Sequence, residues 1–216
     1  MKHLKNFAKF EAVIIPPKLE GDDDIRSFES LVRYGQKNDF DVVEYNEFYE
    51  SIGDGDKKTA PPRFGVPFFA LFHPIRKKAM FVVTDKNVCR FMPMKQIVDD
   101  IIGHERVHAE QSRRKGEIEY ALPSPLNRGE YFSNKEEIMA FAWTIANEIS
   151  KVGYLDISLN QLNNETFKGQ AAQIWNDIKK HCSEDVIKRY RKYIYMYLQE
   201  MFPNDAENIH TKISKR

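Results

Sequence analysis

The hydrophobic pattern of the chain changes along its length, from short mixed segments to long helical periods. In the first 60 residues, an apolar run predicts a short strand at Ala12–Ile15, and apolar residues at helical spacing predict helices at Ile25–Tyr34 and Val42–Ile52. The sequence GDGDKKTAPP that follows predicts an exposed loop, because it combines glycine, proline and charged residues.

The next stretch is rich in β-branched and aromatic residues, which favour strands. FFALF is followed by KKAMFVVTDKNVCRFM, in which two β-rich runs surround Asp85-Lys86-Asn87. We therefore expect strands here, arranged as a hairpin around these three residues. Pro93 stands where a helix can begin, since the first helical turn does not need the N–H donor that proline lacks.

After Tyr131 the pattern is helical almost to the end, with helices expected at about 134–151, 160–181 and 184–202. These periods predict an α+β fold, in which a small mixed sheet packs against one helix and the C-terminal half is mainly helical. We expect three parts, or one compact domain that contains them all: an N-terminal segment at 1–60, a core at 61–153 and a helical segment at 154–216.

Composition and charge restrict the classes of function. Hydrophobic residues make up 42% of the 216 residues, which supports a folded core, and the net charge is only +1. This balance gives no electrostatic reason to expect nucleic-acid binding, and no apolar run approaches the roughly 18–20 residues of a membrane span. The N-terminal sequence MKHLKNFAKFEAVIIPP lacks a secretory cleavage pattern, and Cys89 and Cys182 are isolated, so we expect a cytoplasmic protein.

The nine residues GHERVHAEQ, from Gly103 to Gln111, carry the clearest chemical signal in the chain. At about 100° per residue, His104 and His108 continue the apolar stripe that begins at Ile97, so both imidazoles face inward. Arg106 falls on the opposite side of the helix, where it should leave the histidine face undisturbed.

The spacing of the two histidines has a chemical meaning. Residues four apart lie one turn apart on the same helix face, so both ring nitrogens can bind one metal ion. Glu105 points about 100° away from that face, so it is poorly placed as a ligand but can take a proton from a water at the metal. Six histidines and 18 glutamates in 216 residues give about 0.01 chance matches per chain. The alternative is an amphipathic helix with two buried, hydrogen-bonded histidines.

A catalytic zinc ion usually has three protein ligands, so a third ligand is needed. The sequence YFSNKEEIMAFAWTIANEI contains Ser133 and Glu136 at capping-box spacing, which predicts a helix start near Asn134 and assigns Glu136 to the cap. Glu137 then borders the apolar side of this helix and is the preferred ligand, although an ordinary first-turn acid would give the same pattern. His73, which follows FFALF, is the other candidate ligand.

The sequence HERVH from His104 to His108, followed 29 residues later by ExxA at Glu137, resembles the zincin metallopeptidases of the gluzincin type. EEIMAFA is also similar to the second helix of small peptidases encoded by tailed bacteriophages. The resemblance covers about residues 64–150. It implies that His104, His108 and Glu137 bind Zn²⁺ and that Glu105 is the catalytic base. It also implies that the substrate backbone adds to an edge strand formed by FFALF or MFVVT, and that the protein acts in a host cytoplasm or a virion.

Several roles have two interpretations. Tyr131 and Tyr120 lie between the two motif helices and are either oxyanion-stabilising groups or packing residues. Glu148 either orients a histidine or is a solvated acid. The tyrosines and methionines of RYRKYIYMYLQEMF form either core or a face for a protein partner.

Two functions follow from these patterns. The first is a zinc-dependent peptidase that hydrolyses a peptide or protein substrate by metal-activated water, with Glu105 as general base. The alternative is a non-catalytic protein, such as a virion or host-interaction component, that keeps the zincin frame with a structural or vestigial metal site.

Overall fold

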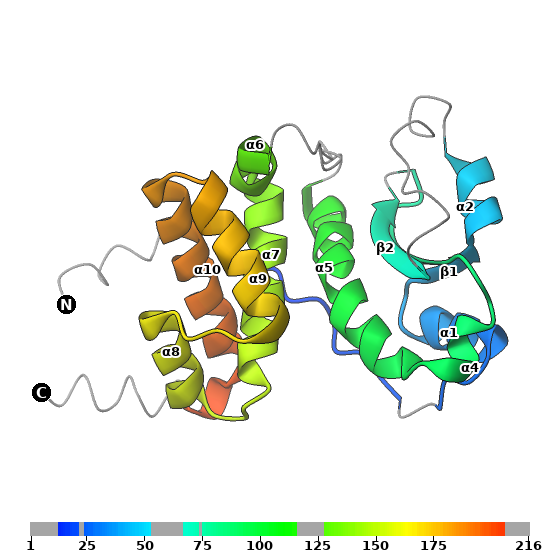
Figure 1. The fold of residues 1–216 in the computed structure, drawn as a ribbon, viewed down its shortest axis with the longest axis horizontal. Coiled ribbons are helices and arrows are strands. Elements are labelled where there is room, and N and C mark those ends of the chain that lie inside the picture. The colour runs from blue at the N-terminus through cyan, green and yellow to red at the C-terminus, as the bar shows by residue number, and fades with distance from the viewer. Residues whose placement is uncertain (1–12, 22–23, 53–66, 74, 116–127, 206–216) are drawn as a thin grey trace, which may run out of the picture.

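A small three-stranded sheet lies at one end of the molecule, and a group of helices lies at the other (Figure 1). The computed structural model describes residues 13–21, 24–52, 67–73, 75–115 and 128–205. The expected α+β class, with a small mixed sheet and a mainly helical C-terminal half, is confirmed. Within the described part of the chain, no helix is both long and apolar enough to cross a membrane.

The sheet contains β1 (Asp41–Glu44), β2 (Phe68–His73) and β3 (Lys78–Val83) in the order β1-β3-β2. Strand β3 is central: it pairs in parallel with β1 and antiparallel with β2. The hairpin is therefore formed by β2 and β3. The hairpin predicted around residues 85–87 is wrong, because the short helix α4 (Val88–Phe91) follows that turn.

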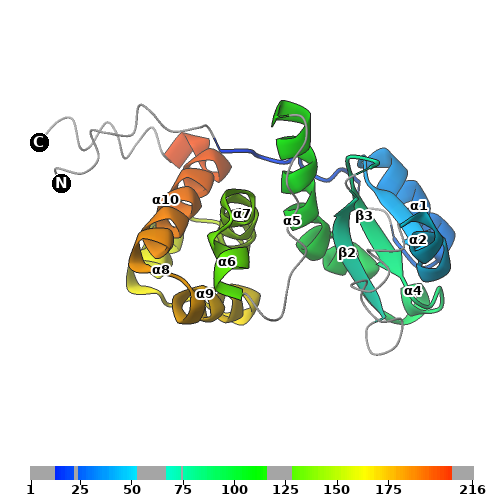
Figure 2. The ribbon, with the colours of Figure 1, turned by 90° about the horizontal axis from the view of Figure 1, so that it is seen from above.

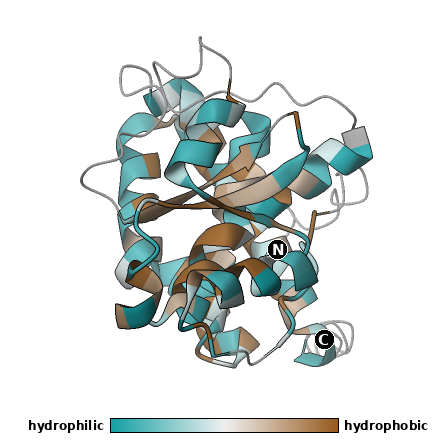
Figure 3. Ribbon diagram, turned by 90° about the vertical axis from the view of Figure 1, so that its right-hand side faces the viewer, coloured by the Kyte–Doolittle hydropathy of each residue, from teal (hydrophilic) through white to brown (hydrophobic). Residues whose placement is uncertain are grey.

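Both faces of β3 are covered, which explains its continuous apolar sequence. Ala79, Phe81 and Val83 lie in a core shared with α1 (Phe28–Lys37) and α5 (Met94–Lys115). Met80 and Val82 point to the other face and pack with α2 (Tyr45–Ser51). Figure 3 shows this pattern as hydrophobic segments at the centre of the molecule, between outer helices that are largely hydrophilic.

The C-terminal half consists of short α6 (Arg128–Ser133) and four longer helices, namely α7 (Lys135–Ser150), α8 (Leu155–Asn164), α9 (Gly169–His181) and α10 (Glu184–Met201). Helix α7 is the centre of this group, since it contacts α6, α8, α9 and α10 and also α5 (Figure 2). The tyrosines of α10 that face α7 are buried, and the hydroxyl of Tyr190 donates a hydrogen bond to the Phe132 carbonyl at 2.8 Å. This face of α10 therefore belongs to the core.

Three further sequence predictions differ from the structure. The segment predicted as a strand near Ile14 forms no sheet pairing; it is buried against the C-terminal helices, where its carbonyl accepts a hydrogen bond from Tyr197 at 3.0 Å. The helix predicted at Val42–Ile52 is divided, because its first residues pair with β3 as strand β1. The helix predicted at 160–181 is also divided, since Glu165 adopts a left-handed conformation that ends α8.

Helix α5 lies between the sheet and the helical group, and it approaches α7 very closely. At this crossing, Gly103 is buried against the indole of Trp143. A Cβ atom added at Gly103 would lie only 1.9 Å from Cη2 of Trp143 and 2.2 Å from its Cζ3. Glycine at position 103 therefore allows the two helices to cross at their observed separation.

We expect Gly103→Ala to reduce the free energy of unfolding by about 1–3 kcal/mol, because the added methyl group overpacks the crossing. Inside a helix, replacing glycine by alanine normally stabilises the protein by roughly 0.5–1 kcal/mol. A loss of stability would therefore point to overpacking at the crossing. Urea denaturation measures the change.

Trp143→Phe provides the matched background for this test, because it removes the indole atoms that the new methyl group would meet. The cost of Gly103→Ala should be smaller in that background. Equal costs in both backgrounds would show that the indole does not limit the approach of the helices.

Candidate metal centre

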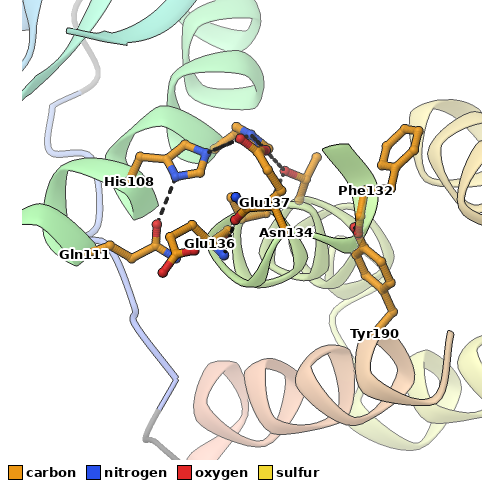
Figure 4. A network of polar contacts seen from close by, with 10 residues as sticks. His108, Gln111, Phe132, Asn134, Glu136, Glu137 and Tyr190 are labelled. Carbon is orange, nitrogen blue, oxygen red and sulfur yellow. Dashed lines mark hydrogen bonds and ion pairs between the residues drawn. The ribbon is translucent and has the colours of Figure 1, made fainter. Parts of the chain in front are cut away.

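Three ligand-type side chains converge where α5 crosses α7. Helix α5 contributes His104 and His108, and the first turn of α7 contributes Glu137 (Figure 4). The two Nε2 atoms are 3.3 Å apart. Oε2 of Glu137 lies 3.4 Å from Nε2 of His104, and Oε1 lies 3.5 Å from Nε2 of His108. The two Nε2 atoms and the Glu137 carboxylate therefore form a compact triangle, in which each nitrogen faces a different carboxylate oxygen.

The size of this triangle fits one face of a zinc coordination tetrahedron. Ligand atoms about 2.0–2.2 Å from zinc in tetrahedral geometry lie about 3.3–3.6 Å from one another. The 3.3 Å between the two nitrogens falls in that range, and each nitrogen lies 3.4 or 3.5 Å from one of the two oxygens of the Glu137 carboxylate. Two imidazoles and one carboxylate are also a ligand set that catalytic zinc sites use. The residues present therefore fit a zinc ion.

The orientation of each imidazole is fixed through its other nitrogen. Nδ1 of His108 lies 2.8 Å from Oε1 of Gln111, and Nδ1 of His104 lies 3.3 Å from Oγ1 of Thr144. Because the Thr144 hydroxyl donates to the Ala140 carbonyl at 3.0 Å, its oxygen is the acceptor for the imidazole N–H. Each ring then carries its hydrogen on Nδ1 and directs the lone pair of Nε2 into the triangle.

While both imidazoles are neutral, this arrangement leaves acceptor atoms facing one another. The two Nε2 lone pairs and the Glu137 carboxylate meet in a buried place, with Glu137 2% exposed and His108 1% exposed. Oε2 of Glu137 is buried and has no hydrogen-bond partner among the described residues. A cation at the centre would satisfy all three groups, which is a second reason to infer a metal site.

In the metal-free protein the charges of these groups stabilise one another. Burial alone would raise the pKa of Glu137, but its contacts with His104 and His108 outweigh burial and lower the pKa to about 2. Burial alone would lower the pKa of His108, but Glu137 and then Glu105 act against it and raise the pKa. The site therefore keeps Glu137 as a carboxylate and attracts positive charge.

The start of α7 differs from the prediction, although the choice of Glu137 over Glu136 does not depend on it. The cap is Asn134, whose side chain accepts a hydrogen bond from the Glu136 backbone N–H at 2.8 Å. Ser133 instead ends α6 and donates to the Gly129 carbonyl at 2.6 Å, so the predicted capping box is wrong. A helix that starts one residue later could exchange the roles of the two glutamates. It does not, because packing against α5 sets which side of α7 faces the histidines.

The other predicted residues divide into those near the triangle and those away from it. Glu105 lies beside the triangle: its charge raises the pKa of His108, and its Oε2 is buried without a hydrogen-bond partner among the described residues. Tyr131 is half-buried, and burial, followed by the charges of Glu137 and Glu105, raises the pKa of its phenol well above the usual value. Its phenol therefore stays protonated and can donate a hydrogen bond.

Two candidates are placed elsewhere. His73 is buried in β2, where its Nδ1 accepts a hydrogen bond from the Arg76 N–H at 3.2 Å, and it does not join the ligand group. Glu148 pairs with Lys151 at 2.7 Å, which agrees with a solvated acid. Tyr120 lies outside the described residues. Arg106 is on the far side of α5, as expected, but it is buried there and donates to the Pro17 carbonyl at 2.7 Å.

Sequence reasoning missed Gly103, Gln111 and the role of Thr144. Gln111 follows His108 by three residues and therefore lies on the same side of α5. A glutamine at a position expected to be buried was the available signal for it. Gly103 gave no such signal, because its importance depends on the indole of another helix.

Zinc affinity should separate the two adjacent glutamates. Glu137→Gln removes a charged ligand and should weaken zinc binding by more than the roughly 10–100-fold that loss of an outer hydrogen-bond partner causes. Glu136→Gln is the matched control and should stay close to wild type, because the substitution keeps the backbone carbonyl of residue 136, which accepts the hydrogen bond from Gln111. Competition with a chromophoric chelator measures both. A large loss in the Glu136 variant alone would contradict this assignment.

No protein-family model, curated protein or solved structure matches this chain. The assignment of the metal centre therefore rests on the geometry of its own residues.

Proposed function

We propose that the protein is a zinc-dependent peptidase with a zincin-like arrangement, in which a small sheet packs on the helix that carries both histidines. The observation that carries the proposal is the convergence of His104, His108 and Glu137 at zinc-ligand separations. Glu105, on the same helix and beside this triangle, supplies the group that a hydrolase needs in addition to a metal.

In this proposal His104, His108 and Glu137 hold the ion. Zinc at such a site supplies Lewis-acid chemistry, which acidifies water and polarises a carbonyl oxygen. The three ligands leave the fourth tetrahedral position available to water and substrate.

Glu105 acts as the general base and then as the general acid. Its carboxylate takes a proton from the oxygen of the attacking water and delivers it to the nitrogen of the leaving amine. The buried Oε2 without a hydrogen-bond partner supports this role, because a carboxylate engaged in structural hydrogen bonds would be less able to accept a proton.

In this proposal Tyr131 stabilises the carbonyl oxygen as negative charge develops on it. The raised pKa keeps the phenol in its hydrogen-bond-donating form at neutral pH. Its ring packs against Phe141, whose ring in turn contacts His104, so the phenol is held near the ligands.

The sheet offers an edge for the substrate. MFVVT lies in β3, which pairs on both sides, so it has no free edge for an added strand. FFALF lies in β2, which is at the edge of the sheet among the described residues. Phe72 of β2 packs near the ring of His108, with centroids 6.4 Å apart, so a peptide added to β2 would run beside the proposed zinc site.

Glu105→Gln should preserve zinc binding and the fold but abolish peptide hydrolysis, because the amide cannot accept the proton from water. The expected loss is about 10²–10⁴-fold in rate. Wild-type and variant proteins, each loaded with one equivalent of zinc, can be compared on a peptide library whose products are identified by mass spectrometry.

Equal turnover by the two proteins would remove Glu105 from the mechanism. Stoichiometric zinc in a wild-type protein that cleaves no member of the library would instead favour the alternative function, a non-catalytic protein with a structural metal.

A further inference from the structure

Gln111 is completely buried on α5, one helical turn beyond His108, and its side-chain amide contacts two groups (Figure 4). Its Nε2 donates a hydrogen bond to the Glu136 carbonyl on α7 at 3.1 Å. Its Oε1 lies 2.8 Å from Nδ1 of His108. One side chain therefore links the second histidine to the helix that carries Glu137.

The two contacts determine one another. A backbone carbonyl can only accept, so the NH₂ end of Gln111 must face Glu136. The oxygen end must then face His108, and an amide oxygen can only accept. Nδ1 of His108 must therefore be the donor, which leaves Nε2 as the atom with the free lone pair. The carbonyl of Glu136 thus fixes, through Gln111, which nitrogen of His108 can bind a metal.

We propose that Gln111 is a positioning residue that holds His108 in the tautomer and ring orientation needed for metal binding. This inference rests on the proposed zinc site, and it adds a determinant of zinc affinity outside the three ligands. Gln111 acts only through His108. Because it is anchored on the carbonyl of Glu136, the residue before Glu137, the orientation of the imidazole depends on the position of the first turn of α7.

The chemistry of the side chain argues against simple core packing. A methionine would occupy nearly the same volume at this buried position without any polar atom to satisfy. A buried amide costs about 1–3 kcal/mol for each polar group left without a partner, and here both ends of the amide are paired. The amide at position 111 therefore has a specific use for its oxygen acceptor, which contacts Nδ1 of His108.

Two substitutions separate positioning from packing. Gln111→Met keeps the volume but removes both hydrogen bonds. Gln111→Glu keeps an acceptor for Nδ1–H of His108 but loses the donor to Glu136. Gln96→Met, at an exposed position of the same helix, is the matched control.

Two measurements apply to each protein. Chelator competition gives the zinc affinity. Long-range ¹H–¹⁵N NMR of the metal-free protein, at a pH where the imidazoles are neutral, shows which ring nitrogen of His108 carries the hydrogen. Thermal unfolding of the metal-free proteins shows whether each variant folds.

Gln111→Met should bind zinc about 10–100-fold more weakly than wild type and should lose the preference for hydrogen on Nδ1 of His108. Gln111→Glu should recover most of the affinity and keep the Nδ1–H tautomer, and Gln96→Met should match wild type in both measurements. A purely structural role would make Gln111→Glu as weak as Gln111→Met, because both lose the link to α7.

Three results would overturn the inference: wild-type affinity in Gln111→Met, equal losses in both variants, or hydrogen on Nε2 of His108 in the wild-type protein. The NMR measurement on the wild-type protein tests the inference even if a variant fails to fold. Zinc bound by the wild-type protein and equally by Gln111→Met would reject the role of Gln111 alone. A wild-type protein that binds no zinc would reject the proposed function, and with it this role for Gln111.

Discussion

The close crossing of α5 and α7 is the constraint on which the rest of the site depends. Two of the proposed ligands come from one helix and the third from the other, so a small change in helix separation would change the distances from Glu137 to both histidines. Gly103 allows this separation, since any larger residue would meet the indole of Trp143. The contact that sets the geometry thus lies beside His104 in sequence but outside the ligand triangle itself.

Each imidazole is also oriented by α7, although both histidines belong to α5. His104 is held by Thr144, and His108 is held by Gln111, which is itself anchored on the Glu136 carbonyl. Such outer contacts fix ring orientation and make the remaining nitrogen a better ligand. The packing of α7 on α5 therefore supplies both the third proposed ligand and the groups that orient the two imidazoles.

The sequence predicts which residues form the candidate site better than it predicts the contacts that hold them in place. The HERVH spacing and the amphipathic pattern placed both histidines on an inward face, and the following helix placed Glu137 near them, because helical periodicity is a local property. The cap of α7 was misassigned because serine and asparagine are both good cap residues one position apart. Strand β1 was missed because four residues are too few to show a period, and their conformation depends on pairing with β3. Gly103 and Gln111 acquire their roles only when α7 is in place.

The position of Glu137 in the first turn of α7 connects helix chemistry with metal chemistry. The N-terminal end of a helix carries partial positive charge, which favours a carboxylate there. Burial acts in the opposite direction, since a charged carboxylate without a partner is costly in the interior. In the metal-free protein, contacts with the two histidines resolve this conflict and keep the pKa of Glu137 at about 2. A zinc ion would take over the same role with a larger charge. The buried acid, which would be costly alone in the interior, is thus the group that would attract a cation to the proposed centre.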